Sequence, residues 1–194
     1  MLYPPLGDES GFRCDSFGDY VFCPARLSGA KRQVLLVESM ARVQSDVRLV
    51  IAGAPDGALD LTRIERAIDR CRVGDRVDLL AGWISEERKR ELFANALACA
   101  YIPFDEDSYG YVSLEAFHSR KPVITCLDSG GTLELVEDGV TGLVTEPDPV
   151  SLAEAFDRLR ADPEAARRLG EAGFARMQEL RISWDHVVQK LTAA

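Results

Sequence analysis

Positive charge is in short supply in this chain of 194 residues. It holds 23 Lys and Arg against 32 Asp and Glu, which gives a formal net charge of −9 and a sequence pI near 4.8. A polyanionic partner would be repelled at long range, so this balance argues against nucleic acid as a partner and against an anionic membrane surface. Any phosphate site must therefore depend on a few local cations.

Long apolar runs and targeting patterns are also missing. No uncharged apolar stretch reaches the ~18 residues that a bilayer crossing needs, and the N-terminus lacks the basic, apolar and small-residue order of a signal peptide. The sequence therefore predicts no transmembrane segment and a cytoplasmic protein. The five cysteines are spread along the chain without a CxxC pair, which predicts reduced, mostly buried thiols instead of a metal or redox site.

The common nucleotide-binding fingerprints are absent as well. Neither GxGxxG nor GxxxxGK[ST] occurs, so the classical dinucleotide-binding and P-loop interpretations lack their motifs. We also find no internal repeat and no low-complexity tract.

What the chain does contain is a regular alternation of short apolar runs and helical patterns. Residues 1–19 carry prolines, glycines and acids without periodicity and predict an irregular lead-in or linker, followed by one domain over 20–194. The expected strands are 20–24, 47–53, 76–80, 98–104, 122–126 and 141–145, and the expected helices are 30–43, 58–72, 86–95, 112–119 and those that begin after Asp148 and Ser183. Repeated strand and helix units of this kind predict an α/β fold with a parallel sheet.

Capping residues support the predicted starts of three helices. Ser85, Asp148 and Ser183 each precede a helical pattern, and Pro149 follows Asp148 at the first helical position. The last helix carries an apolar stripe that begins at Trp184 and that could pack on this domain or cover a neighbouring one.

The first candidate loop follows the strand at 20–24. Ligands of open parallel sheets bind at the carboxyl ends of the strands, and Arg26 and Lys31 stand there between a strand end and a helix start. A guanidinium, an ammonium and a helix N-terminus together could clamp a diphosphate. From spacing alone, two solvated surface cations fit equally well.

The second candidate loop runs from Phe104 to Glu115. Gly110 would let the backbone approach a ligand closely, and the amides around Val112 and Ser113 at the helix start could bind a phosphate. Glu115, one turn into that helix, could accept hydrogen bonds from the vicinal hydroxyls of a ribose, and the acids at 105–107 could do so for a sugar. The alternative is a helix with acidic caps and no ligand.

Two shorter loops complete the set. Ser129, Gly130 and Gly131 follow the strand at 122–126 as a tight turn whose amides could face an anion or a sugar hydroxyl, although such turns are common. Trp83 follows the strand at 76–80 and could offer a ring edge to a base, while a partly buried packing role is the alternative that we favour for it.

Taken in order, these loops resemble the donor-binding C-terminal domain of GT-B retaining glycosyltransferases, the large group called glycosyltransferase family 4 or group 1. The resemblance runs from about Tyr20 to Trp184. Arg26 and Lys31 match two cations of the family pattern, whose two glycines are lost here. The family pattern also has an acidic residue and a glutamate that are separated by seven residues, and residues 107–116, DSYGYVSLEA, match it. The most specific segment of the match is residues 121–144, KPVITCLDSGGTLELVEDGVTGLV.

The match departs from the family at two further places. Either Asp107 or Glu106 could fill the first acidic position, with Glu115 at the second. Arg120 replaces a glycine that usually precedes Lys121, so the chain would either keep a left-handed helix end at this residue at a cost of ~1 kcal/mol or change its path locally.

The resemblance implies a Rossmann-like, three-layer domain with a six-stranded parallel sheet, the C-terminal half of a GT-B architecture. It implies sugar transfer from a nucleotide-diphosphate-sugar with retention, and no metal or cofactor, because Arg26 and Lys31 would neutralise the departing diphosphate. With Asp107 and Glu115 these two form the expected catalytic set. The expected donor contacts are Trp83, Glu106, Tyr109, Gly110, Tyr111, Val112, Ser113, Ser129, Gly130 and Gly131.

The resemblance also implies a partner. Members of this group carry an N-terminal acceptor-binding domain, which this chain lacks, so we expect the chain alone to bind a nucleotide sugar without transferring it. A non-catalytic nucleotide-sugar-binding module and a GT-B-type sugar-nucleotide epimerase are the alternatives. The sequence leaves the base, the sugar and the acceptor open.

Overall fold

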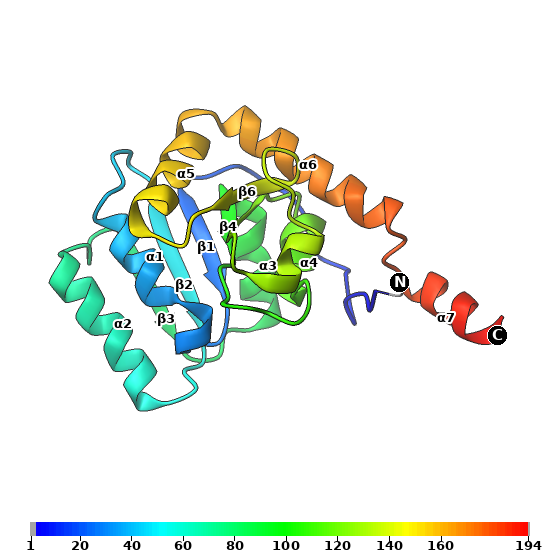
Figure 1. Ribbon diagram of the computed structural model, residues 1–194, viewed down its shortest axis with the longest axis horizontal. Coiled ribbons are helices and arrows are strands. Elements are labelled where there is room, and N and C mark those ends of the chain that lie inside the picture. The colour runs from blue at the N-terminus through cyan, green and yellow to red at the C-terminus, as the bar shows by residue number, and fades with distance from the viewer. Residues whose placement is uncertain (1–2, 194) are drawn as a thin grey trace.

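The computed structural model describes residues 3–193 and contains one six-stranded parallel sheet in the order β3-β2-β1-β4-β5-β6 (Figure 1). The strands are β1 Tyr20–Pro24, β2 Arg48–Gly53, β3 Val77–Ala81, β4 Ala98–Ala100, β5 Val123–Cys126 and β6 Gly142–Thr145. This is the order of a Rossmann fold, in which the chain leaves one edge of the first strand and later returns to the other. The predicted α/β class and six-stranded parallel sheet are confirmed.

Helices cover both faces of the sheet and give three layers (Figure 1). The helices are α1 Gln33–Met40, α2 Ala58–Cys71, α3 Glu86–Asn95, α4 Tyr111–His118, α5 Pro149–Ala161, α6 Pro163–Glu179 and α7 Trp184–Thr192, with 3₁₀ turns at Gly29–Lys31 and Gly130–Glu134. One apolar core joins the sheet to α1, α2 and α5, and the other joins it to α3 and α4. The central strands are buried on both faces, as the near-continuous apolar runs predict.

The predicted caps are present. The Ser85 hydroxyl accepts a hydrogen bond from the Arg88 amide at 3.1 Å, and the Ser183 hydroxyl accepts one from the His186 amide at 3.3 Å. A carboxylate oxygen of Asp148 accepts from the Val150 amide at 2.8 Å. These bonds fix where α3, α7 and α5 begin.

Two predicted elements differ from the structure by more than two residues at one end or both, and α6 was not predicted as a separate helix. The helix expected over 30–43 is divided at Arg32, whose left-handed φ of 55° separates the first 3₁₀ turn from α1. The strand expected over 98–104 ends at Ala100. Pro103 has no amide to give to a neighbouring strand, and the Phe104 amide donates to the Ala30 carbonyl of the first loop.

Four arginines adopt a left-handed backbone conformation that favours glycine. Their φ angles are 55° at Arg32, 56° at Arg72, 51° at Arg120 and 53° at Arg181. Of the two possibilities at Arg120, a left-handed helix end and a local change of path, the structure shows the first. Its guanidinium lies 4.2 Å from the centroid of the Phe174 ring, a cation–π contact that offsets part of the backbone strain.

The lead-in is irregular, as expected, but it is packed along the domain. The amides of Asp15 and Ser16 both donate to the Ala94 carbonyl at 2.9 and 3.1 Å. The fully buried ammonium of Lys121 donates to the Ser16 carbonyl and lies 4.0 Å from the Phe17 ring centroid. This segment is therefore part of the folded body.

The last helix, α7, extends from the body next to the N-terminal segment (Figure 1). The Trp184 indole N–H donates to the Leu6 carbonyl at 2.8 Å, and Val187 is buried, but Trp184, Val188 and Leu191 leave more than half of their surface exposed. Among residues 3–193, no helix combines the length and the apolar character that a membrane crossing would need.

Candidate functional site

The candidate site lies where the strand order reverses, between β1 and β4. The connections after these strands run in opposite directions along the sheet, and ligands of open parallel sheets bind beyond the strand ends at such a switch point. Lys31, after β1, donates a hydrogen bond to the Tyr101 hydroxyl at 3.0 Å and forms an ion pair with Glu106, both of which follow β4. The structure thus joins the first and second candidate loops.

The two predicted clamp cations differ in their surroundings. The Lys31 side chain is only 14% exposed, whereas that of Arg26 is 72% exposed and pairs with Asp56 at 3.1 Å. Exposed pairs of this kind contribute little to stability, while a half-buried ammonium needs its partners. Arg26 is therefore free to turn towards a ligand at little cost.

Arg32 organises the site, although it is not among the residues predicted from the sequence. Its guanidinium donates to the carbonyl oxygens of Ile102 and Pro103 at 2.7 and 2.8 Å and to both carboxylate oxygens of Asp128 at 2.8 Å. It thereby ties the start of α1 to the ends of β4 and β5. The signal was present, because Arg32 stands where the family pattern has a glycine.

The paired glycines let two loops pack together. The Gly131 amide donates to the Glu106 carbonyl at 2.6 Å, and a Cβ at Gly130 would lie 2.4 Å from that same oxygen. The Ser129 hydroxyl accepts from the Cys126 amide at 3.2 Å. The turn at 129–131 therefore supports the acidic loop at 105–107, and the Gly131 amide already has a partner.

Gly110 begins α4 at a point where no side chain fits. Its φ is 69°, and a Cβ there would lie 2.4 Å from a ring carbon of Tyr101. The Ser113 amide donates to the Gly110 carbonyl at 3.0 Å. The backbone at this helix N-terminus therefore lies directly against the ring whose hydroxyl contacts Lys31.

The two tyrosines beside Gly110 point in different directions. Tyr109 is buried, its ring centroid lies 5.4 Å from that of Tyr3, and its hydroxyl donates to the Pro4 carbonyl, so its side chain faces the lead-in. Tyr111 is exposed at the first turn of α4, followed by the half-buried Val112 and the buried Ser113. Only Tyr111 presents a ring to solvent here.

Glu115 lies one turn into α4, as predicted, and is mostly buried. Its carboxylate pairs with Lys89 of α3 at 2.6 Å, and Lys89 also contacts Glu86 at 3.0 Å. Burial raises the pKa of the Glu115 carboxyl and outweighs the opposing effect of Lys89. Burial acts to lower the pKa of Lys89, but its hydrogen bonds and ion pairs with Glu115 and Glu86 outweigh that and raise it.

The acidic residues of the loop at 105–107 differ in solvent exposure. Glu106 is held by Lys31, while Asp107 is exposed beside it. Trp83 is 80% exposed, so the packing role that we favoured for it is wrong. It follows Gly82, whose φ of 136° turns the chain at the end of β3.

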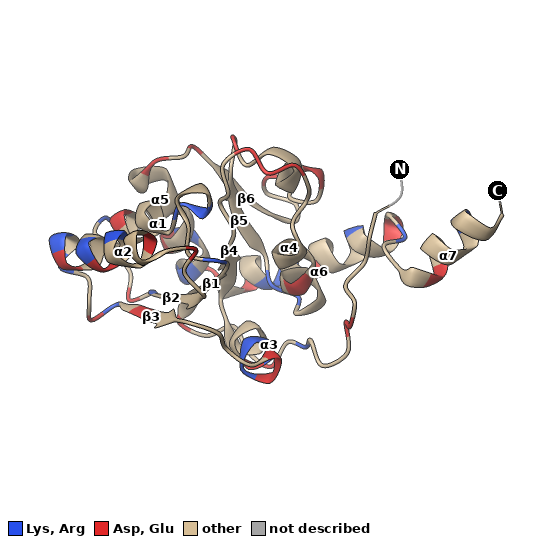
Figure 2. Ribbon diagram, turned by 90° about the horizontal axis from the view of Figure 1, so that it is seen from below, with Lys and Arg blue, Asp and Glu red and all other residues tan. Residues whose placement is uncertain are grey.

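Positive charge at this site comes from single side chains. Figure 2 shows Lys and Arg mixed with Asp and Glu on α2 and α3, without one basic face. Ion pairs within these helices include Arg63–Asp60 on α2 and Arg88–Glu91 on α3.

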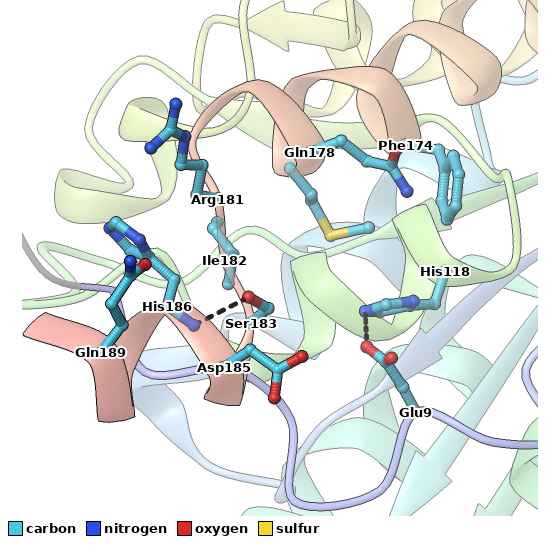
Figure 3. Close-up of a pocket in the computed structure, with 11 residues that line it drawn as sticks. Glu9, His118, Phe174, Gln178, Arg181, Ile182, Ser183, Asp185, His186 and Gln189 are labelled. Atoms are coloured by element: carbon cyan, nitrogen blue, oxygen red, sulfur yellow. Dashed lines mark hydrogen bonds and ion pairs between the residues drawn. The ribbon is translucent and has the colours of Figure 1, made fainter.

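A separate cavity of about 490 Å³ lies between the lead-in, α4, α6 and α7 (Figure 3). His118 and His186 both line it, and the His118 Nε2 atom lies 3.4 Å from a carboxylate oxygen of Glu9. Burial lowers the pKa of His118, and Glu9 opposes that effect. His118 closes the C-terminal end of α4, whereas Gly110 and the strand ends lie at its start.

Comparisons with known proteins point to one family. The family model described as "Glycosyl transferases group 1" matches residues 16–176. The human Alpha-1,3/1,6-mannosyltransferase ALG2 is 31% identical over 153 residues, which cover 74% of this chain and 36% of that protein. The chain therefore spans well under half of this curated relative.

Solved structures share the fold. Sucrose-phosphate synthase from Thermosynechococcus elongatus matches 99% of this chain and 48% of its own with a TM-score of 0.80 and 28% identity. Anabaena Alr3699/HepE, whose structure is described as a complex with UDP, matches 91% of this chain and 49% of its own with a TM-score of 0.78 and 24% identity. In both, the match covers about half of the neighbour.

Proposed function

We propose, since this chain belongs to the group 1 glycosyl transferases, that it binds the nucleoside-diphosphate sugar of a retaining sugar transfer. The observation that carries the proposal is the meeting of Lys31, Tyr101 and the N-terminus of α4 at the switch point of the sheet. A mostly buried cation and a close backbone approach thus lie beside the same tyrosine at the switch point, which suits an anionic ligand.

The diphosphate would lie between Lys31, Arg26 and the start of α4. Lys31 supplies a point charge in a partly desolvated place, and Arg26 supplies a mobile fork of donors from the exposed part of the same loop. Charge that develops on the departing diphosphate would be stabilised by these groups, which favours cleavage of the bond to the sugar. We propose that no metal takes part in this step.

The remaining donor groups would be held around that anion. Glu115 would accept hydrogen bonds from the ribose hydroxyls, and its ion pair with Lys89 opposes the rise in its pKa that burial causes. Asp107 is exposed and would contact the transferred sugar, and the exposed Trp83 ring would lie against the base. The Tyr109 side chain is committed to the lead-in, so its residue would contribute backbone alone.

A second domain would complete the enzyme. Large apolar side chains are exposed in the loops that follow β3, β4 and β5, namely Trp83, Phe104 and Leu127, and at Leu59 in the first turn of α2 after β2. An exposed apolar rim marks a surface that another body covers. Because the matched neighbours are about twice as long as their matched parts, we propose that this body is an acceptor-binding domain.

The two alternatives carry less support. An epimerase needs acid and base groups at the strand ends, but His118 and His186 line the cavity at the other end of α4. A non-catalytic module would share every contact described here and would differ only in turnover.

A two-stage experiment tests the proposal. A thermal-shift panel of UDP-, GDP- and ADP-sugars should identify at least one ligand that raises the Tm of this chain, because binding to the folded state alone stabilises it. Acceptor-dependent nucleotide release should then require an added acceptor domain, since one domain positions only one reactant. No stabilisation by any member of the panel would contradict the proposal, and efficient transfer by the 194 residues unaided would contradict the two-domain requirement.

A further inference from the structure

Lys31 is already occupied by an anion of this chain. Its ammonium forms an ion pair with one carboxylate oxygen of Glu106, and the Tyr101 hydroxyl donates to that same oxygen at 3.1 Å while it accepts from Lys31 at 3.0 Å. All three side chains are largely shielded from solvent. The cation that the donor diphosphate would use is therefore neutralised in the unliganded protein.

The backbone holds Glu106 in this position. The Glu106 carbonyl accepts from the Gly131 amide at 2.6 Å, and the preceding Asp105 amide donates to the Asp128 carbonyl at 2.9 Å. Gly130 lies so close that a Cβ there would contact the Glu106 backbone. The main chain of Glu106 is thus fixed against the 129–131 turn, while its side chain can rotate away from Lys31.

We propose that Glu106 is an internal counter-anion, which neutralises Lys31 until the donor diphosphate displaces it. The inference rests on the proposed function, because it assumes that Lys31 binds the diphosphate. A half-buried ammonium without a partner would be costly in the free protein, and Glu106 removes that cost. The same carboxylate then competes with the ligand, because two anions cannot share one ammonium without repulsion.

This arrangement selects for charge. A ligand must offer Lys31 more than the carboxylate does, and a diphosphate brings more negative charge and more acceptor oxygens than one carboxylate. A neutral sugar or a nucleoside offers Lys31 no charge. Glu106 therefore acts as a filter that favours nucleoside diphosphates over uncharged ligands.

The chain supplies a matched control in Arg26 and Asp56. This pair also joins a predicted clamp cation to an acid, but its side chains are 72% and 40% exposed, against 14% and 22% for Lys31 and Glu106. Exposed ion pairs are worth little, so removing the Asp56 charge frees almost nothing. Glu106→Gln and Asp56→Asn each remove one carboxylate charge beside a predicted clamp cation. The first does so in a shielded place and the second in a more exposed one.

The test is calorimetric titration of UDP, GDP and ADP into the full chain and its variants. Glu106→Gln should bind its best nucleoside diphosphate about tenfold or more tightly than the unmodified chain, because a competing charge-assisted bond is gone. Asp56→Asn should stay within about threefold. In a Lys31→Met background, the further change Glu106→Gln should no longer tighten binding, since the cation that it blocks is absent.

Thermal melting separates this role from a structural one. Glu106→Gln should lower the Tm of the free protein and increase its affinity for the nucleoside diphosphate. If Glu106 were merely structural, the same substitution would lower both the Tm and the affinity. Unchanged or weaker binding by Glu106→Gln, or the same gain in the Lys31→Met background, would overturn the inference and leave the proposed function standing. Binding of no nucleoside diphosphate by any variant would overturn both.

Discussion

Replacing left-handed arginines by glycine should move stability in opposite directions at two positions. Arg72 ends α2 with a φ of 56°, its amide donates to the Asp69 carbonyl at 3.1 Å, and its side chain is exposed. Arg72→Gly removes ~1–2 kcal/mol of backbone strain and adds ~0.5–1 kcal/mol of unfolded-chain entropy. We expect a net gain of about 0.5–1 kcal/mol.

Arg32→Gly makes the same backbone change at almost the same φ but deletes a guanidinium with four partly buried bonds at 2.7–2.8 Å. Hydrogen bonds of this kind are worth ~1 kcal/mol net each, and the carboxylate and carbonyls would lose their partner. The loss exceeds the backbone gain, so we expect a net destabilisation of about 2 kcal/mol or more.

Differential scanning calorimetry measures both. For a domain of this size, ~1 kcal/mol corresponds to about 2–4 °C, so Arg72→Gly should raise the Tm by about 1–4 °C and Arg32→Gly should lower it by about 4–8 °C. If Arg32→Gly raises the Tm, the contacts of Arg32 do not outweigh its strain. The account of Arg32 as the organiser of the site would then be refuted.

Three further outcomes follow from single side chains. Glu115→Gln should fold normally yet bind nucleoside diphosphates at least about tenfold more weakly by calorimetry, because a neutral amide replaces a charged acceptor. Unchanged affinity would show that Glu115 has only a structural role. Burial lowers the pKa of His118 below 6.5, so the folded state binds fewer protons than the unfolded state, and the stability of the fold should decrease as the pH drops through about 6.5. The Tm of His118→Gln should therefore fall less between pH 7.5 and 5.5 than the Tm of the unmodified chain. An equal fall in both proteins would contradict this. Lys121→Met should destabilise the fold by about 2–3 kcal/mol, because the hydrogen bond to the Ser16 carbonyl and the contact with the Phe17 ring are lost. It should also make residues 3–19 sensitive to limited proteolysis. Unchanged protection of that segment would show that other contacts hold it.

Most of the architecture could be predicted because it depends on local patterns. Apolar runs, caps at Ser85 and Asp148, and the glycine position at Arg120 each carry their signal within a few residues. The family pattern has a glycine at the position of Arg32, but the contacts that compensate its backbone strain could not be predicted, because they come from carbonyls and a carboxylate some 70 to 96 residues away.

The site was predictable in its location but not in its pairings. The loops after the strands were the right places to search, since parallel strands present their carboxyl ends at one edge. Which acid faces Lys31 depends on side-chain directions across two loops, and the sequence left Glu106 and Asp107 open. The exposure of Trp83 and the burial of Tyr109 likewise depend on tertiary contacts that no spacing encodes.

The central claim is that Lys31 and Arg26 bind a nucleoside diphosphate at the switch point of the sheet. The most direct test is calorimetric titration of UDP, GDP and ADP into the chain and into the Arg26→Ala, Lys31→Ala double variant. The account predicts measurable binding of at least one of these by the unmodified chain and at least about a hundredfold loss in the double variant, because two charge-assisted contacts at ~1.5–3 kcal/mol each are removed. Unchanged affinity in a folded double variant would contradict it.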